Sequence, residues 1–192
     1  LDTPLYVMTN TTMLRENSPH LPETLDFLAE LGVPTIGLNA LIHAGHGATV
    51  GTGLDESELP PLLDIARSKT DQYGQRLIWY TPTQYCNFDP MQLELGVKGC
   101  TAALYNMCVE PDGSVLPCQS YYQPVGNMLI DSWDDIWSHK LSRYLRERKY
   151  IPDKCEPCAL LDECGGGCPL ALDANRAALI DLDEISIPHP VS

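Results

Sequence analysis

The first half of the chain alternates short apolar runs with amphipathic segments. Apolar, β-favouring residues without a helical period fill residues 5–14, 34–42 and 76–81, and each run predicts a buried strand. Between them, leucines and alanines at helical spacing predict helices over about 22–31 and 57–73, each followed by a glycine suited to a C-terminal cap. The order strand, helix, strand, helix, strand with short links predicts an α/β fold with a parallel sheet.

Three strands are too few to close a barrel or to cover a sheet. An open apolar sheet edge favours aggregation, so we expect further strands upstream of Leu1 and a true N-terminus before it. Ligands of parallel sheets bind at the C-terminal ends of the strands. The polar residues expected there, each with a turn or solvated role as its simplest explanation, are Thr9, Asn10, Asn39, His43, His46, Thr81 and Thr83, together with the glycine-rich loop 43–55.

The second half has a different pattern. Asp112-Gly113 between Val109 and Val115 predicts a β-hairpin. A capping box formed by Ser132 and Asp135 predicts the start of one helix. Its expected apolar face, with the tryptophans as core anchors, consists of Trp133, Ile136, Trp137, Leu141, Tyr144 and Leu145. Residues 170–185 predict an acidic helical tail.

The charge and hydropathy of the chain argue against two classes of function, nucleic-acid binding and membrane association. The chain has 192 residues, 44% of them hydrophobic, with 12 Lys+Arg against 26 Asp+Glu, which gives a net charge of −14. This charge disfavours binding to nucleic acid or to anionic membrane surfaces. No apolar run approaches the roughly 18 residues of a membrane span, and no segment has the order of a signal peptide.

The densest chemical signal is the cysteine-rich loop, residues 155–168, with the spacing Cys155-x2-Cys158-x5-Cys164-x3-Cys168. Thiolates packed so closely repel one another unless a cation lies among them. The three glycines before Cys168 allow a tight turn with inward N–H groups, and amides directed at sulfur suit an iron-sulfur cluster. A structural zinc site is the alternative. The uneven placement of the eight cysteines argues against disulfides, and reduced thiols imply the cytoplasm.

Together, Cys100-x12-Gly113-x4-Cys118 and the cysteine-rich loop resemble the signature of the SPASM domain, the auxiliary iron-sulfur module of many radical SAM enzymes. The segments Pro124-Val-Gly-Asn127 and Asp131-Ser-Trp-Asp-Asp-Ile-Trp137 add to this resemblance, which covers residues 100–168. The preceding half resembles, more weakly, the later strands of the partial (β/α) barrel that holds S-adenosylmethionine. The resemblance implies an α/β barrel portion over 1–98 and a SPASM domain with the acidic tail over 99–192.

The resemblance also implies a division of ligands between two auxiliary 4Fe-4S clusters. The ligands of the first would be Cys100, Cys108, Cys118 and Cys168, and most of those of the second would be Cys155, Cys158 and Cys164. Asn10 and Asn39 are candidates for the S-adenosylmethionine pocket, and the sequence indicates no catalytic residue.

The chain departs from the family pattern in two places. The seventh motif cysteine is absent, so the second cluster could have an open iron, a ligand from Asp173, His189 or Cys86, or not form at all. For Cys86 itself, a role as a small buried hydrophobe is favoured over a chemical one. The radical SAM triad CxxxCxxC is also absent. In the family, that triad holds the cluster that cleaves S-adenosylmethionine, so this chain by itself is not expected to start radical chemistry.

The function implied is that of the C-terminal part of a radical SAM/SPASM enzyme. Its clusters would position substrate and move electrons while a peptide or protein is oxidised or cross-linked, with a reductant such as ferredoxin or flavodoxin. Maturation of a tetrapyrrole or of another small-molecule substrate is an alternative within the family. A stand-alone iron-sulfur electron carrier and a zinc-stabilised interaction module are alternatives outside it.

Overall fold

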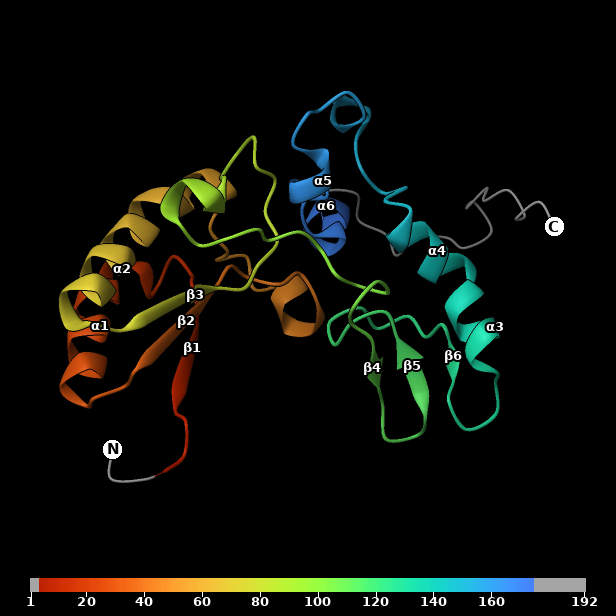
Figure 1. Ribbon diagram of the computed structural model, residues 1–192, viewed down its shortest axis with the longest axis horizontal. Coiled ribbons are helices and arrows are strands. Elements are labelled where there is room, and N and C mark those ends of the chain that lie inside the picture. Colours follow the sequence, from red (N-terminus) through yellow and green to blue (C-terminus); the bar gives the residue numbers. More distant parts are fainter. Residues whose placement is uncertain (1–3, 175–192) are drawn as a thin grey trace.

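The computed structural model describes residues 4–174 and has two parts side by side (Figure 1). The first part contains β1 (Met8–Thr12), α1 (Leu21–Glu30), β2 (Thr35–Asn39), α2 (Leu59–Tyr73) and β3 (Arg76–Trp79). The strands pair in parallel in the order β1-β2-β3, with Asn10 opposite Gly37 and Gly37 opposite Ile78. The predicted α/β fold with a parallel sheet is therefore confirmed.

The strand prediction for residues 5–14 is wrong in length and burial. The strand covers only Met8–Thr12, and its side chains alternate between exposed and half-buried. Among the described residues β1 pairs only with β2, so it lies at an edge of the sheet. Leu5 and Tyr6, which the apolar run placed in the core, are 74% and 66% exposed. By contrast, β2 is central, and four of its five residues are buried.

Helices α1 and α2 lie together on one side of the sheet (Figure 1). Polar contacts join them: the Lys69 ammonium contacts the two Asp26 carboxylate oxygens at 2.6 and 2.7 Å, and the Tyr73 hydroxyl donates to the same carboxylate at 2.7 Å. Gly74, with φ 65°, ends α2 in the left-handed conformation that its cap position predicted. The core between sheet and helices includes Met13, Leu21, Leu25, Val33, Ile36, Leu38, Leu59, Leu63, Ala66, Trp79 and Phe88.

The second part is built around a small antiparallel sheet. Its strands are β4 (Cys108–Val109), β5 (Ser114–Leu116) and β6 (Gly126–Asn127), in the order β4-β5-β6. The turn at Asp112-Gly113 joins β4 to β5, which confirms the predicted hairpin. The two-residue strand β6 is too short to show an alternating pattern, and the sequence did not predict it.

The predicted single helix after Ser132 is two helices, α3 (Trp133–Ser138) and α4 (Lys140–Arg146). His139 between them has φ −53° and ψ 142°, an extended conformation in which its Nδ1 accepts the Leu141 amide at 3.2 Å. The break interrupts the 3.6-residue period, so the expected apolar face does not run through both helices.

The prediction that both tryptophans anchor the core is wrong. Trp133 and Trp137 are 52% and 38% exposed and stack on each other with ring centroids 5.9 Å apart. The Arg146 guanidinium lies 4.0 Å from the Trp137 centroid. The core of this part includes Ala102, Ala103, Val115, Tyr121, Val125, Ile136, Leu141, Leu145 and Tyr150.

Two short helices, α5 (Leu161–Cys164) and α6 (Pro169–Ala174), lie between the two parts (Figure 1). The predicted tail beyond Ala174 lies outside the described residues. The remaining short elements are 3-10 helices: η1 (Ser18–His20), η2 (Gly45–Ala48), η3 (Glu56–Glu58), η4 (Pro90–Leu93) and η5 (Asp153–Cys155). Within residues 4–174, no helix has the length and apolar character needed to cross a membrane.

Candidate metal centres

All eight cysteines have free thiols. The electrostatic interactions among the thiols divide them into two groups. We call Cys100, Cys108, Cys118 and Cys168 the first cysteine group. Burial raises the pKa of the Cys168 thiol to about 12, and the nearby Cys100 and Cys118 thiols add to that rise. Burial likewise raises the pKa of Cys118, with a further contribution from Cys108. The thiols expected to hold the first cluster therefore lie close enough to repel one another when charged.

Backbone hydrogen bonds act in the opposite direction on the same sulfurs. The backbone of Ser120 and Tyr121 lowers the pKa of Cys118, whose rise through burial is the larger effect. Burial also raises the pKa of Cys100, and a backbone hydrogen bond from Ala102 partly offsets that rise. Desolvated thiols with amide donors directed at them form a site that favours bound iron, since the metal offsets the thiolate charge. The residues of the first cysteine group therefore fit an iron-sulfur cluster.

The second cysteine group consists of Cys86, Cys155, Cys158 and Cys164. Burial raises the pKa of the Cys155 thiol, and the neighbouring Lys154 ammonium lowers it. The other three thiols raise it further, in the order Cys164, Cys86 and Cys158. In residues 4–174, no three His, Cys, Asp or Glu side chains converge as they would around one metal ion, so the thiols of each group are near one another without meeting at a point.

The structure corrects the expectation that Cys86 is a small buried hydrophobe, because Cys86 is exposed. Its turn contacts the cysteine-rich loop: the Tyr85 amide donates to Cys164 Sγ at 3.3 Å, and that thiol lies 3.6 Å from the Thr83 carbonyl oxygen. The Asp173 side chain and His189, the other two candidates for the missing ligand, lie outside what the structure describes.

The glycine run of the cysteine-rich loop makes this contact possible. Gly165, Gly166 and Gly167 all have positive φ, at 65°, 82° and 87°. At Gly167 a Cβ would lie 3.0 Å from Gln84 Cγ and 3.2 Å from the Gln84 amide nitrogen. A side chain there would push the loop away from the turn that carries Cys86.

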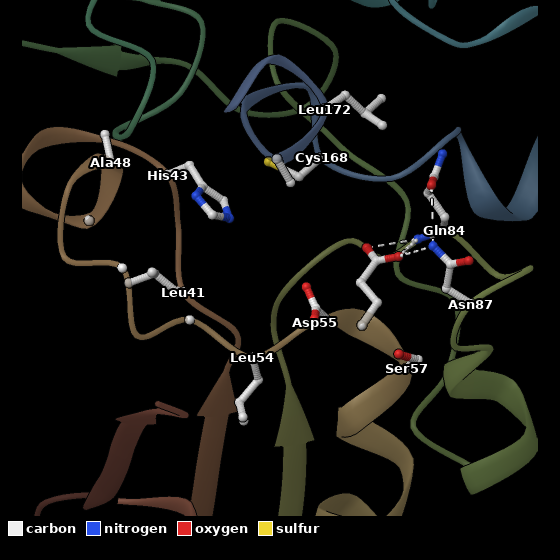
Figure 2. A pocket seen from close by; sticks show the side chains of 15 residues that line it. Leu41, His43, Ala48, Leu54, Asp55, Ser57, Gln84, Asn87, Cys168 and Leu172 are labelled. Carbon is white, nitrogen blue, oxygen red and sulfur yellow. Dashed lines mark hydrogen bonds between the residues drawn. The ribbon is translucent and has the colours of Figure 1, made fainter. Parts of the chain in front are cut away.

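A pocket of about 510 Å³ separates the glycine-rich loop from the cysteine-rich loop (Figure 2). His43 and Asp55 line it from the first, Cys168 from the second, and Ala171 and Leu172 from α6. A volume in this range suits a small molecule or a substrate side chain. Since Cys168 also belongs to the first cysteine group, a cluster held there would adjoin the pocket.

Glu56 is the acidic group whose pKa the pocket changes most clearly. Burial raises the pKa of its carboxyl, and hydrogen bonds from Asn87 and from the Gln84 backbone partly oppose this. The carboxylate accepts the Gln84 amide at 3.1 and 3.2 Å and Asn87 Nδ2 at 2.9 Å (Figure 2). Sequence patterns did not single out Glu56, because its role depends on a turn about 30 residues away.

Asn10 and Asn39, the residues predicted for the S-adenosylmethionine pocket, lie next to each other but outside the pocket lined by His43 and Cys168. Asn10 is the middle residue of β1 and Asn39 is the last residue of β2, and the Asn39 side-chain amide donates to Asn10 Oδ1. Neither is among the residues that line the pocket.

Comparison with known proteins finds an iron-sulfur domain in the second part of the chain. Residues 100–159 match the family model of SPASM, an iron-sulfur cluster-binding domain. The match includes Cys100, Cys108, Cys118, Cys155 and Cys158, while Cys164 and Cys168 lie beyond it. No curated protein matches the chain significantly.

Solved structures share the fold of both parts. Streptococcus suis SuiB bound to S-adenosylmethionine is similar with a TM-score of 0.63 and 18% identity, over 85% of this chain and 41% of that one. Native anSMEcpe with bound AdoMet is similar with a TM-score of 0.57 and 16% identity, over 90% of this chain and 50% of that one. Native anSMEcpe with AdoMet and the Cp18Cys peptide has a TM-score of 0.55 and 15% identity, over the same shares of the two chains.

The chain thus has the fold that it shares with SuiB and anSMEcpe, and its residues 100–159 match a SPASM iron-sulfur cluster-binding domain. It spans less than half the length of SuiB and half the length of anSMEcpe.

Proposed function

We propose that this chain is the C-terminal part of a radical SAM/SPASM enzyme that modifies a peptide or protein. Residues 1–98 would be the end of the barrel and residues 99–192 the SPASM domain. The SPASM match and the shared fold support the enzyme class, and the peptide in one anSMEcpe structure supports the substrate class. The intact protein would bind S-adenosylmethionine, take electrons from a ferredoxin or flavodoxin, and work in the cytoplasm.

The proposed first cluster is held by Cys100, Cys108, Cys118 and Cys168. This assignment is supported by the interactions among their thiols and by the backbone hydrogen bonds to Cys100, Cys118 and Cys168. The proposed second cluster takes Cys155, Cys158 and Cys164. When bound, 4Fe-4S clusters supply one-electron transfer. The chain's own residues would hold the substrate beside them, since the pocket between the two parts is open to Cys168.

Asn10 and Asn39 remain our proposal for the S-adenosylmethionine site. Asn39 lies at the carboxyl end of β2, where parallel sheets bind ligands, and its side chain is hydrogen-bonded to Asn10 of the adjacent strand. The pocket lined by His43 and Cys168 is then left for the substrate, at the same edge of the sheet.

The observation that carries the proposal is the place of Cys168, whose half-buried thiol interacts with Cys100 and Cys118 and also lines the pocket. Metal analysis of the chain after anaerobic reconstitution with iron and sulfide tests the cluster assignment. We expect a brown protein with about eight iron per chain, the content of two 4Fe-4S clusters. A colourless protein that retains zinc in near-integral ratio would contradict it and favour an interaction module.

The enzyme assignment has a separate test in the coding sequence upstream of Leu1. An open reading frame that continues into a CxxxCxxC triad supports the radical enzyme. A start codon directly before Leu1 would contradict it and favour a separate electron carrier.

A further inference from the structure

The second cluster lacks a fourth ligand within the family's motif. The cysteine-rich loop contributes Cys155, Cys158 and Cys164, whereas Cys168 belongs to the first cysteine group. A cluster with three cysteine ligands leaves one iron open to solvent or to another donor. The structure brings one further thiol to this group, that of Cys86.

The turn that carries Cys86 is attached directly to a proposed ligand. The Tyr85 amide, one residue before Cys86, donates to Cys164 Sγ at 3.3 Å. Cys164 is buried, and its thiol also lies 3.6 Å from the Thr83 carbonyl oxygen. The backbone on the N-terminal side of Cys86 is therefore fixed against Cys164.

The Cys86 side chain lies next to the start of the cysteine-rich loop. Its Sγ is 3.9 Å from Nζ of Lys154, the residue directly before Cys155. A lysine ammonium between two thiols offsets part of the negative charge that a thiolate-ligated cluster carries. Cys86 is thus placed by contacts with two segments that carry proposed ligands.

The turn itself is held in place. Glu56 accepts hydrogen bonds from the Gln84 amide and from Asn87 Nδ2, on both sides of Cys86. The Asn87 and Phe88 amides donate to the Gln84 carbonyl at 2.8 and 2.9 Å. Phe88 is buried against Trp79 at the end of β3, with ring centroids 5.9 Å apart. A thiol on such a turn is preorganised, as a metal ligand should be.

We propose that Cys86 is the fourth cysteine ligand of the second cluster, with Cys155, Cys158 and Cys164. Each thiol binds iron as the thiolate and releases its proton to solvent. This inference rests on the proposed function, because it requires the clusters to form. It gives the barrel part a ligand in the SPASM cluster, so that the cluster joins the two parts of the chain.

The test compares the reconstituted wild-type chain with Cys86→Ala by iron analysis and by EPR after dithionite reduction. We expect two cubane-type signals in the wild type. In Cys86→Ala we expect the first signal to be unchanged and the second to be lost or shifted, with a loss of about one to four iron per chain. The control is Gln92→Ala, since Gln92 is exposed, lies in η4 outside this turn and leaves all eight thiols in place, and both signals should remain.

Alkylation gives a second readout. We expect iodoacetamide followed by mass spectrometry to label Cys86 in the iron-stripped chain and not in the loaded chain. Equal labelling in both states would overturn the proposal, as would unchanged signals in Cys86→Ala or an equal loss in Gln92→Ala. Those results leave the wild-type clusters intact, whereas a wild type without any cluster signal would contradict the proposed function itself.

Discussion

The Tyr85 amide and the Cys164 thiol, 79 residues apart in the sequence, are joined by a hydrogen bond of 3.3 Å. This contact links the turn after β3 to the cysteine-rich loop. An N–H donor directed at sulfur stabilises a thiolate and a cluster bound to it. The turn after β3 and the cysteine-rich loop therefore meet at the Cys164 sulfur, and the packing of this turn is expected to depend on metal binding by the loop.

Replacing Cys168 should disturb the first cluster and leave the second. Cys168→Ala removes a half-buried thiol that interacts with Cys100 and Cys118. We expect the reconstituted variant to lose about four iron, the content of one 4Fe-4S cluster, and one of two EPR signals. Cys158→Ala is the matched control, since Cys158 is exposed and belongs to the other group, and it should affect the other signal. The same signal affected in both variants would contradict the division into two groups.

Gly167 should tolerate no side chain. Gly167→Ala combines a positive φ of 87° with a Cβ 3.2 Å from the Gln84 amide nitrogen. We expect the free energy of unfolding to fall by about 2 kcal/mol or more, measured by denaturant unfolding. Gly96→Ala is the control, since Gly96 has φ 77° and open space around its Cβ position. Its cost should be only the conformational one, about 1 kcal/mol. Equal costs at the two positions would contradict the close approach of the loop to the turn.

The hydroxyl of Tyr150 stabilises the glycine run. It is buried and donates to the Gly165 carbonyl at 2.9 Å, and burial raises its pKa well above the ordinary value. Tyr150→Phe leaves that carbonyl without its partner, so the free energy of unfolding should fall by about 1–3 kcal/mol. Tyr105→Phe at an 84% exposed site should change it by less than about 0.5 kcal/mol. A Tyr150→Phe protein as stable as the wild type would show that the hydrogen bond contributes nothing.

The raised pKa of Glu56 predicts that the stability of the folded chain depends on pH. Burial raises its folded-state pKa above the ordinary 4.5, so the folded state binds this proton more tightly than the unfolded state does. The resulting stabilisation is complete below pH 4.5 and is lost as the pH rises through the raised pKa. Glu56→Gln removes the titration.

The measurement is the difference in unfolding midpoint between the wild type and Glu56→Gln, taken from pH 5 to pH 8. We expect the wild type to lose stability relative to the variant as the pH rises. A difference that stays constant, or that changes in favour of the wild type, would contradict the raised pKa.

The sequence predicted the elements whose signals are local. Apolar runs and helical spacing located the three parallel strands and their two helices, and Asp112-Gly113 located the hairpin. The sequence patterns gave wrong predictions where contacts with distant segments determine burial or helix length. Residues 5–14 are apolar enough for a core strand, but β1 lies at the edge of the described sheet. Nothing in the pattern around His139 marks the break between α3 and α4.

The candidate site likewise has features that local sequence patterns predicted and features that only the tertiary packing reveals. The spacing of the cysteine-rich loop and its resemblance to SPASM predicted iron-sulfur binding without any coordinates. The position of Cys86 beside Cys155 depends on how the turn after β3 packs against that loop, through contacts of Glu56 and Gly167. Such contacts between distant segments leave no periodic trace in a single sequence, so Cys86 remained one of several candidates.

The most direct test of the account is EPR of the dithionite-reduced wild-type chain after anaerobic reconstitution, together with iron and sulfide analysis. The account predicts two cubane-type signals with about eight iron and eight sulfide per chain. A single signal with about four iron would contradict it, because it would mean that one of the two cysteine groups holds no cluster.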